Sequence, residues 1–228
     1  MSELWLVMDS GLCGATWNMA LDEALLLGAT ECGRPVLRFY GWNEGAATFG
    51  YFQHYADIER WTLLRPLLRR PTGGGLVPHQ ADWTYSVAIP PQHPWYRLQA
   101  VLSYQRLHEW IRSSMALLNI ASELCPETRK EIPGQCFAGA EKYDLLWRGR
   151  KMAGAAQRRT RNGLLIQGSV QPQPPGITRA AWQKAMCEAA TQDFQAQWEA
   201  VAPDVALRRR ADALAAEKYA LDDYNKRR

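Results

Sequence analysis

Three consecutive glycines follow a pair of arginines in the segment Arg69-Arg70-Pro71-Thr72-Gly73-Gly74-Gly75. Glycine reaches positive φ and lacks the side chain that would keep a ligand away from the backbone. Exposed N–H groups beside two cations suit a carboxylate, a phosphate or a developing oxyanion. The segment therefore predicts either a ligand-binding loop or, more simply, a flexible turn between strands.

A lysine stands among small residues further along the chain, in the segment Lys151-Met152-Ala153-Gly154-Ala155-Ala156. The small neighbours leave room beside its amine, so the side chain could reach a carbonyl or a phosphate instead of extending into water. Considered alone, Lys151 is more simply a surface lysine.

Cys136 lies between these two segments, in a stretch rich in glycine and polar residues. The thiolate is the reactive form of cysteine, and nearby cations lower the pKa of a thiol from about 8.5. Lys151 or the arginines that surround it could have this effect. The alternative is that Cys136 packs as a small apolar side chain. The other cysteines, at positions 13, 32, 125 and 187, form no CxxC pair, which suits a reducing compartment.

Together these segments resemble the biotin/lipoate protein ligase superfamily, specifically its lipoate branch of lipoate–protein ligases and octanoyltransferases. Further matching segments are 17–23, 37–42 and 49–53, and the resemblance covers roughly residues 4 to 170. The biotin branch has a GRGRxGR-type loop that this sequence lacks, which leaves a biotin–protein ligase as a distant alternative.

The resemblance implies an apolar tunnel that holds a medium-chain acyl group for transfer to one lysine of a lipoyl carrier domain. The glycine loop and Lys151 would flank the acyl carbonyl, and Cys136 would form an acyl-thioester, as in one family of octanoyltransferases. Lys151 and Cys136 are the expected catalytic residues, and no metal site is expected. The expected substrate-binding residues are Arg69, Arg70, Thr72, Gly73, Gly74, Gly75, Val77, His79, Tyr85, Gly154 and Ala155.

Two mechanisms remain open. In the favoured one, octanoyl-acyl carrier protein donates the acyl group and no cofactor is needed. In the alternative, ATP and Mg activate free lipoate or octanoate as an adenylate near the glycine loop, and Cys136 is dispensable. The sequence of residues 82–86 is closer to the pattern of the transferases, whereas Gly75, which completes the glycine triplet, matches the pattern of the ligases. His79 could be catalytic or could order the glycine loop through a hydrogen bond.

The elements that must position these residues include both strands and helices. Hydrophobic periodicity predicts strands near 4–9, 35–41, 46–50 and 83–89, and helices near 16–29, 98–118, 178–190 and 204–222. The fold class is therefore α/β (α+β), and the resemblance implies the biotin/lipoate protein ligase catalytic-domain fold, with a mixed sheet packed with helices. Large residues alternate over 83–89, so Trp83 and Tyr85 face either the core or the acyl tunnel.

Three prolines between 171 and 176 mark a boundary. The chain divides into a catalytic domain, 1–170, and a Pro-rich linker with a short helical C-terminal appendage, 171–228. Many autonomous lipoate ligases carry a larger accessory domain, so this short appendage weakens the ATP-dependent interpretation.

Composition and charge limit the class of protein. The 228 residues are 47% hydrophobic and include ten tryptophans, enough for a sizeable core. The sequence has neither a membrane-spanning apolar run nor a signal peptide, so we expect a cytoplasmic protein. The net charge is +4, with arginines clustered over 148–161 and 208–210.

The clustered arginines predict a positive face for an acidic protein partner, either a lipoyl carrier domain or an acyl carrier protein. Two alternatives without catalysis stay open, a binder of lipoylated domains and an RNA-binding protein. No nucleic-acid-binding module is recognisable in the sequence, so nucleic acid is an unfavoured partner.

Overall fold

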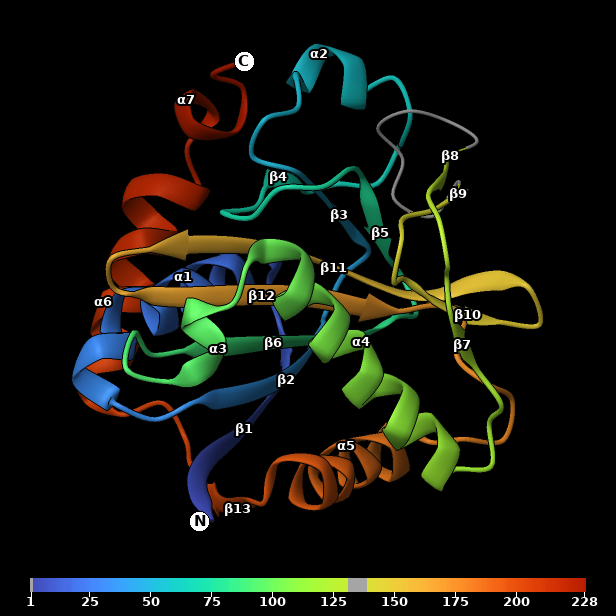
Figure 1. The fold of residues 1–228 in the computed structure, drawn as a ribbon. Helices are drawn as coiled ribbons and strands as arrows, with labels where there is room; N and C mark the ends of the chain where they lie inside the picture. Colours follow the sequence, from blue (N-terminus) through green and yellow to red (C-terminus); the bar gives the residue numbers. More distant parts are fainter. Residues whose placement is uncertain (1, 131–138) are drawn as a thin grey trace.

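A computed structural model describes residues 2–130 and 139–228. An eight-stranded mixed sheet forms its centre, with the strand order β13-β1-β2-β6-β12-β11-β10-β7 (Figure 1). β1 runs parallel to its neighbours β2 and β13, and the other neighbouring strands are antiparallel. The strands are β1 (Glu3–Cys13), β2 (Val36–Trp42), β6 (Trp83–Ile89), β7 (Glu123–Leu124), β10 (Leu145–Trp147), β11 (Arg150–Thr160), β12 (Gly163–Val170) and β13 (Ala196–Ala200).

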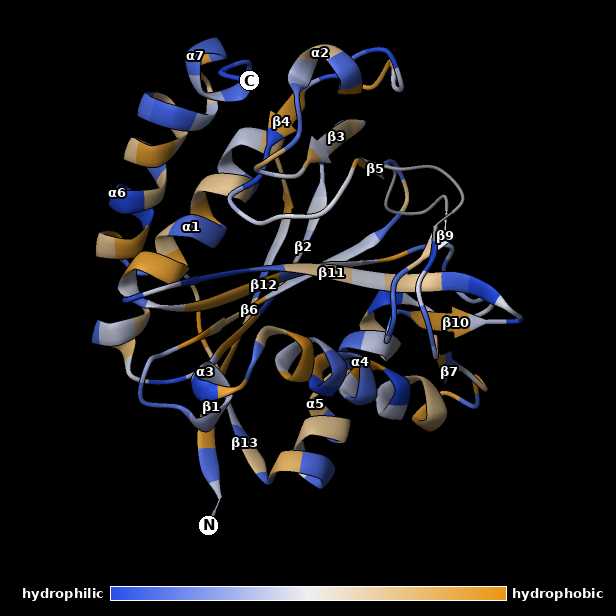
Figure 2. Cartoon of the chain, turned by 45° about the horizontal axis from the view of Figure 1, so that its top comes forward, coloured by the Kyte–Doolittle hydropathy of each residue, from blue (hydrophilic) through white to orange (hydrophobic). Residues whose placement is uncertain are grey.

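Different helices cover the two faces of this sheet (Figure 1). One face carries α4 (Ala100–Leu117) and α5 (Arg179–Phe194), and the other carries α1 (Ala15–Cys32) and α6 (Val205–Leu214). Side chains alternate along β6, so Tyr85 enters the core beneath α4 and α5 while Ala88 packs against α1. Figure 2 shows apolar residues along the central strands between these two helical layers.

A second sheet of three short strands stands beside the main one, in the order β4-β3-β5. Its strands are β3 (Ala46–Phe49), β4 (Leu67–Arg69) and β5 (Val77–His79). The glycine loop connects β4 to β5, and Gly74 in it has a φ of +81°. The loop packs directly on Gly50, where a Cβ atom would lie 1.8 Å from the carbonyl oxygen of Gly74. Position 50 therefore requires glycine.

The remaining elements lie around these two sheets. They are α2 (Tyr55–Ile58), α3 (Pro94–Arg97), β8 (Arg129–Lys130), β9 (Gly139–Ala140), the π-helix η1 (Ala215–Tyr219) and α7 (Asp222–Asn225). None of the helices in the described ranges is long and apolar enough to cross a membrane.

The segment after residue 170 is largely helical, as predicted, yet it is built into the same core as the rest of the chain. β13 pairs with β1 at the edge of the main sheet. Trp182 on α5 is fully buried and stacks on Trp83, with ring centroids 5.3 Å apart. The Oδ1 atom of Asn225 accepts a hydrogen bond from the backbone N–H of Arg69 at 2.9 Å. Apolar side chains of residues 171–228 therefore complete the core that residues 2–170 begin.

Candidate functional site

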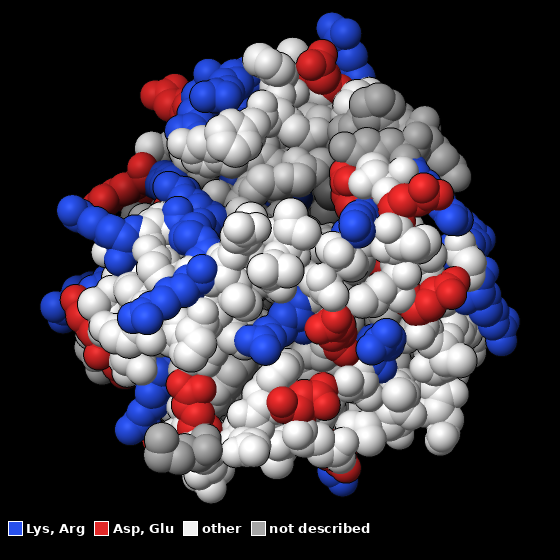
Figure 3. Space-filling view, viewed as in Figure 1, with Lys and Arg blue, Asp and Glu red and all other residues white. Residues whose placement is uncertain are grey.

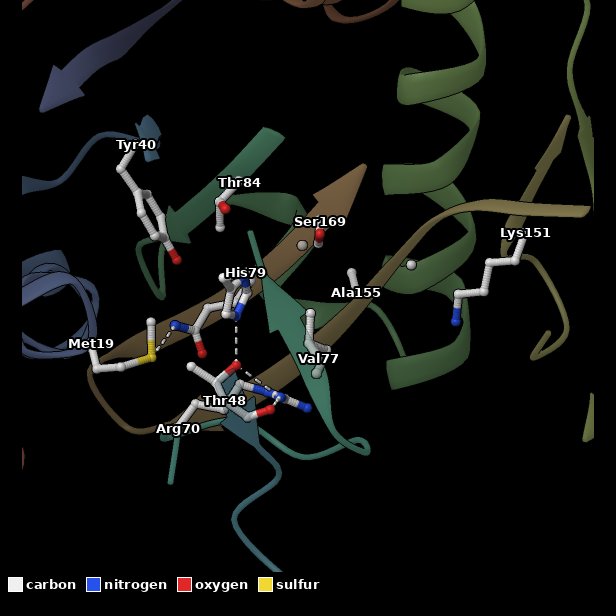
Figure 4. A pocket seen from close by; sticks show the side chains of 14 residues that line it. Met19, Tyr40, Thr48, Arg70, Val77, His79, Thr84, Lys151, Ala155 and Ser169 are labelled. Atoms are coloured by element: carbon white, nitrogen blue, oxygen red, sulfur yellow. Dashed lines mark hydrogen bonds between the residues drawn. The ribbon is translucent and has the colours of Figure 1, made fainter. Parts of the chain in front are cut away.

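A pocket opens between the main sheet and the three-stranded sheet. Figure 4 shows Lys151 at one side of it and Met19 and Tyr40 at the opposite side. Thr84 and Ser169 line it from β6 and β12. The described lining residues are Met19, Tyr40, Thr48, Arg70, Val77, His79, Thr84, Lys151, Gly154, Ala155, Ala156, Gln167, Gly168 and Ser169. This arrangement suits an elongated ligand with its reacting end at the lysine.

Lys151 is held in place by a buried carboxylate. Its Nζ atom lies 2.7 Å from Oδ2 of Asp144, and the lysine side chain is 7% exposed while the aspartate is fully buried. Asp144 also accepts hydrogen bonds from the hydroxyl of Tyr104 and, at 2.6 Å, from the backbone N–H of Glu141. Burial and the Asp144 carboxylate raise the pKa of Tyr104 well above its usual value, so its phenol stays protonated and donates. The buried charge of Asp144 is thus compensated from several directions.

Gly154 leaves the space through which the side chain of Lys151 reaches the pocket. A Cβ atom at position 154 would lie 2.6 Å from Cε and 2.7 Å from Nζ of the lysine. Contacts that short do not occur between real side chains, so any larger residue would displace the amine. The small residues after Lys151 therefore leave room beside its amine, as predicted.

His79 is fixed by a hydrogen-bond relay and a ring stack. Its ring stacks on Trp42 with centroids 3.9 Å apart. Its Nε2 atom lies 2.9 Å from Thr48 Oγ1, and its Nδ1 atom lies 2.9 Å from Asp82 Oδ2. Burial alone would raise the pKa of Asp82, but His79 and hydrogen bonds from Ser169 and Thr84 bring it below its usual value. His79 thus ties β5 to β3 and to the main sheet, and it also lines the pocket.

The two arginines before the glycine loop hold the backbone. Arg70 donates from Nη2 to the carbonyl oxygens of Gly73 and Gly75 at 2.6 and 2.7 Å, which fixes the shape of the loop. Arg69 is fully buried and donates to carbonyl oxygens of Tyr51, Gln53, Tyr224 and Asn225. Arg69 does not line the pocket, which differs from the expected contact with substrate, because its guanidinium connects the small sheet to the C-terminal helix.

A buried polar network supports the inner part of the pocket. Asp22 of α1 accepts hydrogen bonds from Arg38, Tyr40, Ser86 and Gln167 at 2.6 to 2.8 Å. Gln167 in turn accepts one from Thr72 Oγ1 at 2.7 Å, which connects the glycine loop to the main sheet. Every member that lines the pocket therefore has a fixed orientation.

A match to one protein family covers more than half of the chain. Residues 15–173 match the model of the lipoyl protein ligase A/B catalytic domain. The chain belongs to this family. The matched segment ends close to the boundary that the prolines predict at 170, although the packing continues beyond it.

Two octanoyltransferases are identical to this chain at about a third of the aligned residues. Octanoyltransferase LipM of Bacillus subtilis is 36% identical over 183 residues, which cover 74% of this chain and 65% of the relative. Octanoyltransferase LipM of Staphylococcus aureus is 34% identical over 184 residues, which cover 75% and 66%. The chain thus spans about 65% of the length of these relatives.

Solved structures of lipoate protein ligases have the same fold. A lipoate–protein ligase A bound with ATP matches with a TM-score of 0.80 at 17% identity, covering 99% of both chains. The bipartite lipoate protein ligase of Thermoplasma acidophilum, solved with its E2 lipoyl domain, matches with a TM-score of 0.76 at 18% identity, covering 99% of this chain and 97% of that one. These matches confirm the predicted mixed-sheet fold of this family.

The site contains some of the predicted residues and leaves others outside the pocket. Those that line it are Arg70, Val77, His79, Lys151, Gly154 and Ala155. Thr72 and the three glycines do not line it, although Thr72 donates a hydrogen bond to the lining residue Gln167. Tyr85 lies on the opposite face of the sheet, fully buried against Trp182 and above Gly168. Cys136 lies outside the described residues.

Several residues of the site were not predicted from the sequence. Asp144 is the most important, because it pairs with Lys151 from the position just before β10. Others are Met19, Tyr40, Thr48, Thr84, Gln167 and Ser169. For Thr84 and Ser169 the alternation of strand side chains offered a signal, since polar residues there face away from the core. Among the described residues no three His, Cys, Asp or Glu side chains converge as a metal site would require.

Proposed function

We propose that this protein is an octanoyltransferase, which moves an octanoyl group from an acyl carrier protein to one lysine of a lipoyl carrier domain. The observation that carries the proposal is the pocket that ends at Lys151, in a chain 36% identical to an octanoyltransferase. A pocket with the apolar side chain of Met19 at one side and the amine of Lys151 at the other suits an acyl chain with a polar carbonyl end.

Lys151 acts on the carbonyl oxygen. Its ammonium group has a fixed direction because Asp144 holds it at 2.7 Å, and a preoriented donor stabilises the oxyanion of a tetrahedral intermediate without reorganisation. The glycine loop, held in shape by Arg70, would present its backbone N–H groups to the acyl carbonyl from the other side. In this proposal the loop and Lys151 together bind the carbonyl end of the acyl group.

The covalent steps use the Cys136 thiol as the nucleophile, a role proposed from the sequence. The Cys136 thiolate attacks the carbonyl carbon of the octanoyl thioester, and the carrier leaves as a thiol after taking up a proton. The amine of the acceptor lysine then attacks the enzyme thioester. Cys136 leaves as a thiolate, the amine loses a proton, and an amide remains.

This route needs neither ATP nor a metal ion, because the donor is already a thioester. The alternative is an ATP-dependent lipoate–protein ligase, which would use ATP and Mg to form an acyl-adenylate and would not need Cys136. The similarity to octanoyltransferases at 33 to 36% identity favours the transferase. We place the reaction in the cytoplasm, where both carrier proteins would be available.

Intact mass spectrometry of a lipoyl carrier domain separates the two mechanisms. One mixture contains octanoyl-acyl carrier protein without ATP, and the other contains lipoate, ATP and Mg. The proposal expects an octanoyl adduct in the first mixture and its loss in Cys136→Ala and Lys151→Ala. An adduct only in the second mixture, unaffected by Cys136→Ala, would identify a ligase.

A further inference from the structure

A surface groove adjoins the pocket, and the two cavities share the side chain of Lys151. The groove runs between residues 78–81 on one side and the β10–β11 hairpin on the other, with residues 171–173 along its length. An acyl chain in the pocket would place its carbonyl at Lys151. The incoming amine must then approach from the side that the acyl chain does not fill, and the groove leads there.

The groove is positively charged. Arg148 and Arg150 are both exposed at its border, and its described residues include no aspartate or glutamate. Basic side chains follow the right edge of the molecule in Figure 3, where the β10–β11 hairpin lies in Figure 1. An acidic partner would therefore be complementary to this surface.

The turn of the hairpin holds Arg148 over the groove at a conformational cost. Trp147 pairs with Arg150, so the loop consists of Arg148 and Gly149, whose φ angles are +51° and +73°. A two-residue loop with both residues at positive φ favours asparagine, aspartate and glycine. The guanidinium carbon of Arg148 lies 4.5 Å from the centroid of the Trp147 ring, which directs the charge. An arginine at this position indicates a role that outweighs its conformational cost.

We propose that this groove binds the acceptor protein, through acidic residues that flank the lysine to be acylated. The proposal rests on the proposed function for the identity of the acceptor. Arg148 and Arg150 contact the acidic flanks, and the acceptor lysine extends along the groove to the acyl carbonyl at Lys151. The groove thereby selects the protein substrate, whereas the pocket selects the acyl group.

Calorimetric titration with an apo lipoyl carrier domain, in the absence of any acyl donor, tests this proposal. Arg148→Asn removes the charge while supplying a residue that the turn prefers, so the hairpin stays folded. Arg150→Glu reverses the second charge. Arg209→Asn and Arg209→Glu are matched controls, because Arg209 is exposed on α6, far from the hairpin in Figure 1.

We expect each groove variant to raise the Kd about tenfold at low salt, and less at high salt, while the Arg209 variants match the wild type. Each groove variant should weaken acceptor binding by a larger factor than it slows acyl-enzyme formation from octanoyl-acyl carrier protein. An unaltered Kd, the absence of binding to the wild type, or variants that impair only the donor step would overturn the proposal. Arginine-dependent binding without any acyl transfer would contradict the proposed function and leave the groove assignment standing.

Discussion

The Nζ atom of Lys151 lies 2.7 Å from the Oδ2 atom of Asp144, and water reaches little of either side chain. Tyr104 approaches the other carboxylate oxygen from α4. This pairing restricts the rotamers of the lysine and fixes the orientation of its amine as a hydrogen-bond donor. The contribution of Asp144 to the proposed reaction can be measured separately from the contribution of the lysine.

Asp144→Asn should lower kcat about 100-fold with little change in the KM for the acyl donor, because a displaced donor stabilises the oxyanion poorly. Asparagine keeps the size of the side chain, so the fold is retained. Steady-state octanoylation kinetics would show the effect. In the Lys151→Ala background the same substitution should cost almost nothing, and fully additive losses would show that Asp144 acts independently of the lysine.

Gly154→Ala should reduce kcat strongly without unfolding the protein. The added Cβ would lie 2.6 Å from Cε of Lys151, and the flexible lysine would move before the strand does. Gly45→Ala is the matched control, since its added Cβ would meet only Leu64, at an ordinary 3.5 Å. Equal activity of the two variants, with equal melting temperatures, would contradict the proposed path of the lysine.

Met19→Ala should shift the preference of the enzyme toward longer acyl chains. Met19 is 2% exposed and lies opposite Lys151 across the pocket (Figure 4), so its truncation lengthens the space for the chain. Burying two more methylene groups contributes about 1.6 kcal/mol, so the ratio of decanoyl to octanoyl transfer should rise about tenfold. Competition between the two acyl donors, read by the mass of the acceptor, measures this ratio. A ratio unchanged in a folded variant would place the end of the pocket elsewhere.

Much of this architecture could be predicted from periodicity. The strand at β6 and the helices α1, α4 and α5 follow clear apolar patterns, and they were found where the sequence indicates them. β11 was missed because small and charged residues dominate its sequence, and its pairing with β12 and β10 determines its conformation. The integration of β13 and α7 was missed because long-range partners such as Arg69 and Asn225 leave no local signal.

The site could be predicted only in part for the same reason. A lysine among small residues is recognisable in a sequence, and the structure places Lys151 and Gly154 at the pocket. Asp144, Gln167 and Met19 look like ordinary core or strand residues, and only the folded chain brings them to the pocket. The family resemblance placed Tyr85 at the acyl tunnel, whereas the alternation of side chains along β6 turns it into the core beneath α4 and α5.

His108 should make the stability of the protein depend on pH. This histidine is fully buried on α4, and burial lowers its pKa from 6.5 to about 4. Between these two values the unfolded chain binds a proton that the folded chain does not bind. Stability is therefore fully present above pH 6.5 and falls by about 3 kcal/mol as the pH drops to 4.

Urea unfolding at pH 7 and pH 4.5 isolates this contribution. Between these two pH values the free energy of unfolding of His108→Gln should fall by about 2 kcal/mol less than that of the wild type, because the other titratable groups are the same in both proteins. Identical losses would show that another group accounts for the acid sensitivity.

The central claim is that Lys151 promotes octanoyl transfer at the end of this pocket. The most direct test mixes octanoyl-acyl carrier protein and an apo lipoyl carrier domain with the wild type or with Lys151→Ala, without ATP, and follows the mass of the acceptor in a single turnover. We predict complete octanoylation by the wild type and a rate at least about 1,000-fold lower in the variant. An acceptor whose mass stays constant with the wild type, or rises equally fast with both proteins, would contradict this account.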